Sequence, residues 1–233
     1  MRRALATSVI ALAAFAPPAA AVPRLHQLVV FRDGNARVSQ PSMAQTTVKV
    51  GHRRCSVAGA TPLAALIRSG IGPLSLRDYG SCGKRAVNSS SLFVAAIGPD
   101  RNRGSDGWVY KTGNVLGTAG AADPTGPLGR GRLHPGARVT WFWCHVTARD
   151  NGCPHTLAAT LTAGAGELAV HVRQYDDRGK GAPARGATVH AGTATAATGS
   201  AGTARLALPA GRYRVWAEQP TRIRSFPTVA EVK

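Results

Sequence analysis

The sequence predicts an α+β domain followed by an all-β domain. Three observations favour this plan. In the first part of the chain, one amphipathic helix pattern lies among short β-type segments, whereas residues 167–233 carry strand patterns alone. Two aromatic segments, residues 106–111 and 138–144, contain three of the four Trp residues. The composition also changes at residues 162–166, because all four Cys residues precede this stretch and no Cys or Asn follows it.

The N-terminus has the features of a secretory signal peptide. It combines a basic start, an apolar run over residues 5–15 and small residues at 19–21. The apolar run is too short to cross a hydrocarbon core of about 30 Å, and Pro17-Pro18 interrupts it. We therefore expect a signal peptide over residues 1–21, cleavage after Ala21, and a secreted chain without a transmembrane segment.

The first predicted domain begins with strands. Residues 27–31 form a β-branched and aromatic run, and Asp33-Gly34 follows as a hairpin-type turn. A second strand is expected at residues 46–50, which alternate Thr or Lys with Val. After the helix, three more strands are expected at residues 91–97, 107–111 and 138–144.

The helix pattern has a clear start and a clear end. Thr61 suits the N-cap position and Pro62 the first helical position, while Gly70 suits the C-terminal end. The apolar face comprises Leu63, Leu66 and Ile67. Strands, one helix and further strands follow each other in the order of a β-grasp (ubiquitin-like) fold, with the helix packed on one sheet face.

The aromatic segments have two interpretations. In residues 138–144, Trp141 and Trp143 alternate with Thr140 and Phe142, so the two Trp residues share one sheet face. They either fill the core under the helix or form a stacking platform below the glycine-rich loop of residues 112–136. If a platform exists, four residues are the candidates for ligand contact: Tyr110, Trp143, Arg130 and Arg132.

Several segments of the first domain resemble one known family. Residues 60–67 (Ala-Thr-Pro-Leu-Ala-Ala-Leu-Ile) and 107–110 (Gly-Trp-Val-Tyr) resemble the transcobalamin C-terminal-like β-grasp family. Residues 79–80 and 92–98 resemble the version common in secreted actinobacterial proteins of unknown function. The resemblance extends over residues 27–145, although Ala137 stands where Asp is usual. It implies a soluble ligand-binding or interaction module. Cobalamin binding is not implied, because the chain has no helical barrel to hold the corrinoid.

The C-terminal part resembles a second family. Residues 181–189 and 202–217 are similar to the hairpin and the closing strands of carboxypeptidase-regulatory-like and bacterial Ig-like (prealbumin-like) sandwiches. Apolar residues alternate on both sides of the turn at residues 209–211, as expected for two antiparallel strands. We expect the β-grasp domain over residues 22–162, a linker at 163–166, and the sandwich over 167–233.

Export gives the four cysteines an oxidising environment, in which paired Cys residues form disulfides. Three pairings are possible, and the shortest loops favour Cys55 with Cys82 and Cys144 with Cys153. The spacing of the Cys and His residues does not match the usual zinc patterns, so we expect no metal site. We expect no other cofactor either. The metal alternative would use Cys144, His145, Cys153 and His155.

The chain is strongly basic. Without Arg2 and Arg3, 27 of the 29 basic residues remain against 11 acidic ones, which gives a net charge of +16. Such a charge favours weak, non-specific affinity for polyanions, including cell-wall polymers. The basic residues are scattered rather than clustered, so specific nucleic-acid recognition is not expected.

Signatures of catalysis are missing from the sequence. It contains no nucleophile elbow, zinc-protease motif or phosphate-binding loop, and Asp176-Asp177 precedes Arg178-Gly179 in a turn-like setting. The sequence therefore predicts a secreted, non-enzymatic ligand-binding or interaction protein of the bacterial cell exterior with an unknown ligand. The alternatives are a structural protein held by charge in the cell wall or matrix and, more remotely, a secreted hydrolase.

Overall fold

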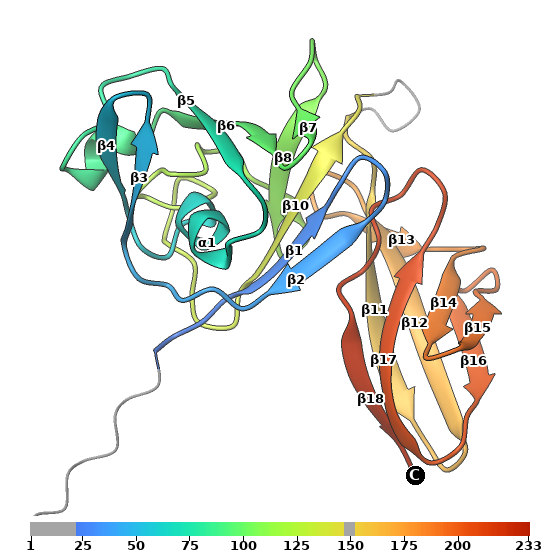
Figure 1. The fold of residues 1–233 in the computed structure, drawn as a ribbon. Helices are drawn as coiled ribbons and strands as arrows, with labels where there is room; N and C mark the ends of the chain where they lie inside the picture. The colour runs from blue at the N-terminus through green and yellow to red at the C-terminus, as the bar shows by residue number, and fades with distance from the viewer. Residues whose placement is uncertain (1–21, 147–151) are drawn as a thin grey trace, which may run out of the picture.

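The computed structural model describes residues 22–146, here called the first unit, and residues 152–233, the second unit. The predicted signal peptide lies outside the described residues. Both units are built mostly of β-strands, and they lie side by side (Figure 1). Within these two ranges, no helix has the length and apolar character needed to cross a membrane.

A five-stranded sheet forms the centre of the first unit. Its middle strand, β10, runs parallel to its neighbour β1, although the two come from opposite ends of the unit, and the other neighbours pair antiparallel. The strands in spatial order are β2 (Ala36–Ser39), β1 (His26–Val30), β10 (Arg138–Cys144), β8 (Gly107–Thr112) and β9 (Val115–Leu116).

Helix α1 (Pro62–Ser69) lies against the face of this sheet that points away from the second unit (Figure 1). Its start and end are as predicted. The Thr61 hydroxyl accepts a hydrogen bond from the Ala64 N–H at 3.3 Å, and Gly70 ends the helix in the left-handed region at φ 63°. The helix therefore buries its apolar side against the aromatic face of β8 and β10.

Smaller elements complete the first unit. They are the hairpin of β3 (Thr46–Val50) and β4 (Arg53–Val57), the sheet of β5 (Leu74–Asp78), β6 (Leu92–Ile97) and β7 (Asp100–Arg101), and the 3₁₀ turn η1 (Ala86–Ser89). A disulfide between Cys55 and Cys82 ties β4 to the segment before η1, which confirms the predicted pair. The sequence reading missed β2, β4, β5 and the two-residue strands.

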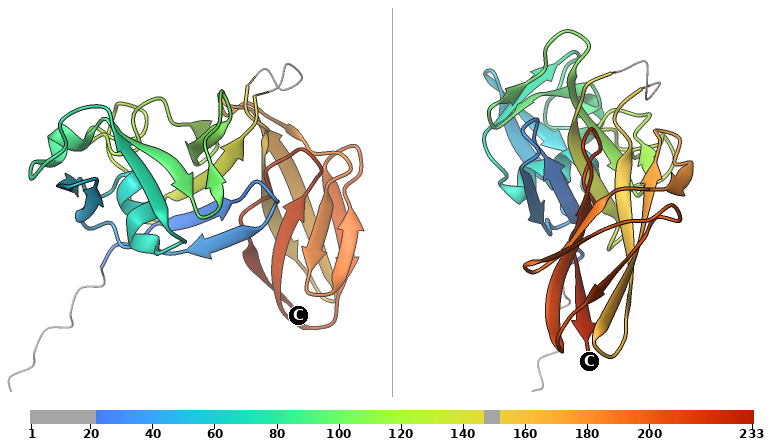
Figure 2. Two further views of the ribbon diagram at one scale, coloured as in Figure 1. Left: turned by 45° about the horizontal axis from the view of Figure 1, so that its top comes forward. Right: turned by 90° about the vertical axis from the view of Figure 1, so that its right-hand side faces the viewer.

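Two four-stranded sheets pack face to face in the second unit (Figure 2, right). The first contains β11 (Thr156–Ala163), β12 (Glu167–Tyr175), β13 (Gly181–Pro183) and β16 (Thr203–Ala207). The second contains β15 (Ala194–Ala197), β14 (Thr188–Ala191), β17 (Gly211–Glu218) and β18 (Thr228–Val232). Alternating apolar residues such as Val170, Val172, Val189 and Val215 fill the space between the sheets.

The predicted linker needs correction. Residues 163–166 include the end of β11 and the tight turn into β12, and Ala163 pairs with Leu168 at the closed end of this hairpin. The Gly164 N–H donates to the Glu167 carbonyl oxygen at 2.8 Å. Strand β11 therefore belongs to the second unit, and the change between units precedes Thr156.

Candidate functional site

The aromatic face of β8 and β10 is a filled core. Trp141 and Trp143 are buried in the same apolar cluster as Trp108 and Tyr110. The Trp108 and Trp143 rings meet edge to face with centroids 6.0 Å apart, an arrangement favourable for aromatic pairs. The core interpretation therefore describes most of this face, and only Trp143 reaches the wall of a cavity.

The structure places Tyr110 inside the core, which corrects its selection as a ligand contact. Its hydroxyl donates to the Ala119 carbonyl oxygen at 2.6 Å, and the Pro127 carbonyl oxygen lies at 3.3 Å. A Cβ atom at Gly117 would overlap the Tyr110 ring, so the glycine-rich loop closes directly over this side chain. Tyr110 thus holds the loop in place.

The two loop arginines lie elsewhere. Arg130 and Arg132 are exposed, and the Arg132 Nε–H donates to the Pro124 carbonyl oxygen of its own loop at 2.9 Å. Neither residue lines the cavity that Trp143 reaches. The four candidates from the sequence are therefore not brought together into one site.

The opposite face of the five-stranded sheet packs on the second unit. Leu28, Val30 and Phe142 form an apolar cluster there with Ile223, which precedes β18. The Cys144–Cys153 disulfide belongs to the same cluster, which confirms the second predicted pair. Because both sulfur atoms are consumed in this bond, the alternative metal site built on these two cysteines is wrong. In the described ranges, no group of His, Cys, Asp and Glu residues is arranged to hold a metal.

A buried lysine fastens the two units together. Lys111 of β8 has no exposed surface, and its ammonium group donates to the carbonyl oxygens of Tyr175 at 3.1 Å and Asp176 at 2.8 Å. The Asp177 carboxylate lies 3.4 Å away. Burial lowers the pKa of Lys111, whereas the nearby carboxylates of Asp177 and Asp176 oppose that shift.

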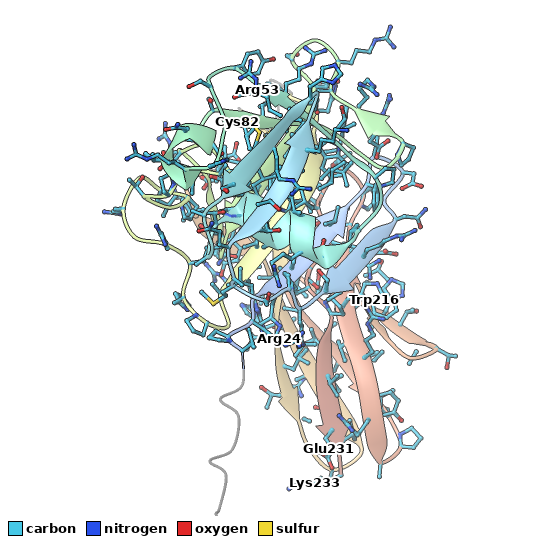
Figure 3. The ribbon with its side chains drawn as sticks, turned by 60° about the vertical axis from the view of Figure 1, so that its left-hand side comes forward. Arg24, Arg53, Cys82, Trp216, Glu231 and Lys233 are labelled. Carbon is cyan, nitrogen blue, oxygen red and sulfur yellow. A yellow bond between two sulfur atoms is a disulfide. The ribbon has the colours of Figure 1, made fainter. Side chains whose placement is uncertain are left out.

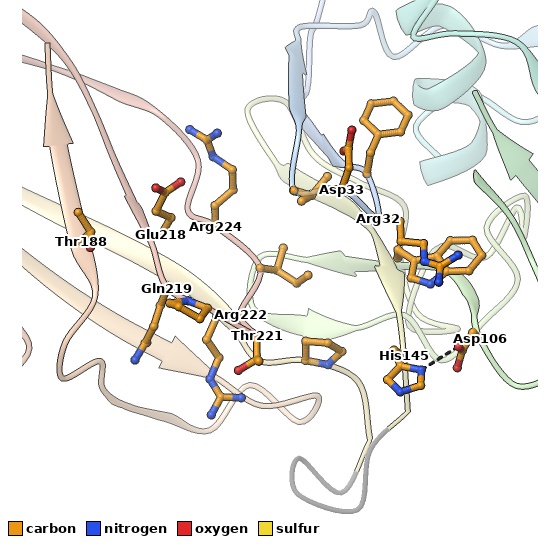
Figure 4. A pocket seen from close by; sticks show the side chains of 17 residues that line it. Arg32, Asp33, Asp106, His145, Thr188, Glu218, Gln219, Thr221, Arg222 and Arg224 are labelled. Carbon is orange, nitrogen blue, oxygen red and sulfur yellow. Dashed lines mark hydrogen bonds and ion pairs between the residues drawn. The ribbon is translucent and has the colours of Figure 1, made fainter. Parts of the chain in front are cut away.

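A cleft of about 870 Å³ opens between the units (Figure 4). Its apolar surface comes from both units and includes Phe31, Trp143, Pro154 and Ile223. Its charged groups are Arg32, Asp33, Asp106, His145, Glu218, Arg222 and Arg224. Apolar walls with a few polar groups are typical of sites that bind small molecules.

On the side of the first unit, His145 pairs with Asp106. The His145 Nδ1 atom lies 2.7 Å from an Asp106 carboxylate oxygen, as the dashed line in Figure 4 marks. The side chains are 66% and 29% exposed, so water surrounds the pair. A His–carboxylate pair in a buried setting would have supported a hydrolase, and this pair does not have that setting.

On the side of the second unit, Glu218 and Arg224 line the cleft, and both contact a stack formed by His190 and Trp216. The His190 and Trp216 rings are parallel to within 4° with centroids 4.8 Å apart, and the Arg224 guanidinium carbon lies 5.0 Å from the Trp216 ring centroid. Glu218 accepts a hydrogen bond from His190 Nε2 at 2.9 Å. Burial lowers the pKa of Arg224, and the charge of Glu218 opposes this effect.

Three polar atoms of this wall are buried without a hydrogen-bond partner in the described part of the chain. They are Trp216 Nε1, Arg224 Nε and Gln219 Oε1, and both Arg224 and Gln219 line the cleft. Trp216 Nε1 and Arg224 Nε are donors, and Gln219 Oε1 is an acceptor. Buried polar atoms left unpaired are costly, so Arg224 Nε and Gln219 Oε1 mark positions where a ligand could supply an acceptor and a donor. The sequence analysis missed this wall, although Trp216 stands between the core residues Val215 and Ala217 and so faces outward.

No known protein family, curated protein or solved structure matches this chain. The cleft itself therefore provides the main indication of function. Its two walls differ in chemistry, because the first unit contributes an exposed ion pair and the second unit contributes Arg224, which stacks over Trp216 and has an unpaired Nε–H donor.

Proposed function

We propose that this protein is a secreted, non-enzymatic binding protein of the bacterial cell exterior and that its ligand occupies the cleft between the two units. The observation that carries the proposal is the wall of the second unit. There, Arg224 lines an apolar cavity of ligand size, stacks over the Trp216 ring and has a buried Nε–H donor without a partner in the described part of the chain.

The carboxylates that line the cleft already have partners within the protein, and this favours a ligand rich in acceptor oxygens. Asp106 is paired with His145, Glu218 is paired with His190, and Asp33 accepts hydrogen bonds within its own turn. The carboxylates of the cleft are therefore engaged by the protein. A ring-shaped ligand that carries carboxylate or hydroxyl groups, such as an acidic saccharide, would lie against the apolar wall and accept from the donors.

The rigid joint between the units supports binding without domain closure. Lys111, the Cys144–Cys153 disulfide and the apolar cluster around Phe142 all connect the units behind the cleft. A cleft that is formed before the ligand arrives avoids much of the ordering cost of binding. Two disulfides also support a location in an oxidising compartment outside the cytosol.

We further propose the finer fold assignment that the sequence suggested. The parallel pairing of β1 with β10, together with α1 on one sheet face, supports a β-grasp first unit related to the transcobalamin C-terminal-like family. The two packed sheets of the second unit support an Ig-like or prealbumin-like sandwich.

Calorimetric titration tests the binding proposal. The ligands are corrinoids, neutral oligosaccharides, uronic-acid oligosaccharides and soluble peptidoglycan fragments. We expect a uronic-acid-bearing ligand to bind and Arg224→Gln to weaken it at least tenfold, because a charge-assisted hydrogen bond contributes about 1.5–3 kcal/mol.

Arg212→Gln is the matched control. Arg212 lies on β17, is exposed and does not line the cleft, so its replacement changes the net charge equally without touching the site. Affinity should be unchanged in this variant. Equal losses in the Arg212 and Arg224 variants, or no binding by any ligand of the series, would contradict the proposal.

A further inference from the structure

A second candidate surface lies on the first unit, at the end far from the second unit. The segment from residue 44 to residue 98 contains seven Lys or Arg residues and a single acidic residue, Asp78, for a net charge of +6. All seven are exposed, and the six that lie outside helix α1 make up what we call the basic tip: Lys49, Arg53, Arg54, Arg77, Lys84 and Arg85. In Figures 1 and 2, β3, β4 and η1 stand at the opposite end of the molecule from the sandwich.

Covalent and hydrogen-bonded links hold the basic tip together. The Cys55–Cys82 disulfide joins β4 to the segment that carries Lys84 and Arg85, and the Ser56 N–H donates to the Gly83 carbonyl oxygen at 2.8 Å. Figure 3 shows Arg53 and Cys82 close to each other on this end. The basic residues therefore form one surface although they come from separate elements.

The only acidic residue of the segment adds little negative charge to this surface. The Asp78 side chain is 9% exposed, and its oxygens accept hydrogen bonds from the N–H groups of Gly80 and Cys82, each at 3.0 Å. Arg53 also lies 3.2 Å from this carboxylate. The Asp78 carboxylate thus stabilises the tip from within through these contacts, and the exposed surface remains basic.

Apolar side chains project from the same surface. Tyr79, Val87 and Phe93 are 70%, 55% and 42% exposed, and the Tyr79 and Phe93 rings meet at an angle of 63° with centroids 6.0 Å apart. Phe93 pairs across the strands with Arg77, so an aromatic ring and a guanidinium group are direct neighbours. Of the seven large apolar side chains exposed in the described ranges, these three belong to the tip.

We propose that the basic tip docks on the surface of an anionic phospholipid bilayer, with Tyr79 and Phe93 entering the headgroup region. Basic side chains are attracted to anionic headgroups, and exposed aromatic side chains gain by partial burial at that interface. A hydrated soluble polyanion would satisfy the charges but would leave the apolar groups in water. This docking goes beyond ligand binding in the cleft, which lies at the other end of the first unit and stays open.

Vesicle co-sedimentation tests the proposal with the protein expressed from Val22 to Lys233. We expect binding to vesicles of phosphatidylcholine mixed with phosphatidylglycerol, and at least tenfold weaker binding to phosphatidylcholine alone. Raising the ionic strength from about 0.1 M to about 1 M shortens the Debye length from about 10 Å to about 3 Å, so binding should fall strongly.

Two variants separate the contributions of charge and apolar contact. The triple variant Arg54→Gln, Lys84→Gln and Arg85→Gln should weaken vesicle binding at least tenfold. The double variant Tyr79→Ser and Phe93→Ser should also weaken vesicle binding, yet bind soluble polyphosphate as the parent does. The charge-matched control, with Arg178, Arg185 and Arg212 of the second unit changed to Gln, should bind vesicles nearly as the parent does.

Three outcomes would overturn the proposal. The first is a control variant as impaired as the tip variant, which would mean that net charge alone drives adsorption. The second is a double variant that keeps full vesicle binding, which would mean that the tip is a general polyanion surface. The third is no binding to the anionic vesicles. Unchanged thermal midpoints in the surface variants exclude misfolding as the cause of a loss.

Discussion

The ammonium nitrogen of Lys111 lies 2.8 Å from the main-chain carbonyl oxygen of Asp176, and this contact joins the two units of the molecule. Lys111 has no exposed surface, so its charge depends on these protein oxygens for solvation. The β12–β13 turn that supplies them is held in turn by the Leu116 N–H, which donates to the Asp177 carbonyl oxygen at 2.9 Å. The geometry of the cleft therefore rests on a buried polar joint as well as on apolar contact.

Lys111→Met should destabilise the protein by about 3 kcal/mol, because it keeps the apolar stem but leaves the buried Asp176 carbonyl and Asp177 carboxylate without their cation. Urea denaturation measures the loss. Lys180→Met is the control, since Lys180 lies after the same turn but is exposed. It should change the free energy of unfolding by less than about 0.5 kcal/mol. Similar losses in both variants would show that the buried contacts of Lys111 contribute nothing specific.

Tyr110→Phe should change how stability responds to alkali. Burial, with a smaller contribution from the charge of Asp123, raises the pKa of Tyr110 from 10.0 to about 12. The neutral phenol therefore stabilises the folded state fully below pH 10, and this contribution is lost as the pH rises towards 12. The Phe variant should lose less stability over that interval than the parent, measured by denaturation at a series of pH values.

At neutral pH the same variant should be less stable than the parent by about 1 kcal/mol, because the Ala119 carbonyl oxygen loses its hydrogen bond from the Tyr110 hydroxyl. Tyr79→Phe is the control, since Tyr79 is exposed. It should leave both the neutral stability and its alkaline decline unchanged. An unaltered alkaline decline in the Tyr110 variant would contradict the assignment.

The elements that the sequence predicted well are those with strong local signals. Thr61 and Gly70 mark both ends of α1, and the apolar and aromatic run of β10 fixes both ends of that strand. Strand β11 was missed because residues 156–163 are mostly Ala and Thr, which do not produce a marked apolar alternation. The linker predicted at residues 163–166 is a tight turn instead, and the prediction was wrong because a tight turn and a flexible linker have the same local composition.

The cleft could not be predicted in the same way. Its walls come from segments far apart in the sequence, and the stack of Trp216 and Arg224 needs the turn between β17 and β18 to fold back on the sheet. Tyr110 was misplaced for a related reason. Its strand position indicated a buried or partly buried face, but only the tertiary path of the loop at Ala119 and Pro127 shows what covers it.

Removal of the two disulfides should have unequal costs. In the chain-entropy description, the stabilisation grows with the loop that the bond closes, and the two pairs are separated by 27 and 9 residues. Replacing Cys55 and Cys82 together by Ala should cost about 4 kcal/mol, and replacing Cys144 and Cys153 about 3 kcal/mol. Because all four sulfurs are buried, the packing losses are comparable. Denaturation of both double variants would show the order, and the reverse order would contradict the entropic argument.

A strained turn forms one lip of the cleft. The Arg222 N–H donates to the Gln219 carbonyl oxygen at 3.1 Å, which closes a four-residue turn with Pro220 and Thr221 at its centre. Thr221 has φ 63°, and in a turn of this kind Pro is favoured before a residue of positive φ that is usually Gly. A β-branched residue in this conformation carries strain of about 1 kcal/mol or more.

Thr221→Gly should therefore raise the free energy of unfolding by up to about 1 kcal/mol, since relief of the strain exceeds the greater freedom of Gly in the unfolded chain. Thr47→Gly is the matched control. Thr47 is an exposed residue within β3, where Gly should cost about 0.5–1 kcal/mol. Thermal and urea denaturation would reveal opposite signs for the two changes. If Thr221→Gly instead lowers stability, side-chain contacts of Thr221 outweigh the backbone strain, and the turn is held by those contacts.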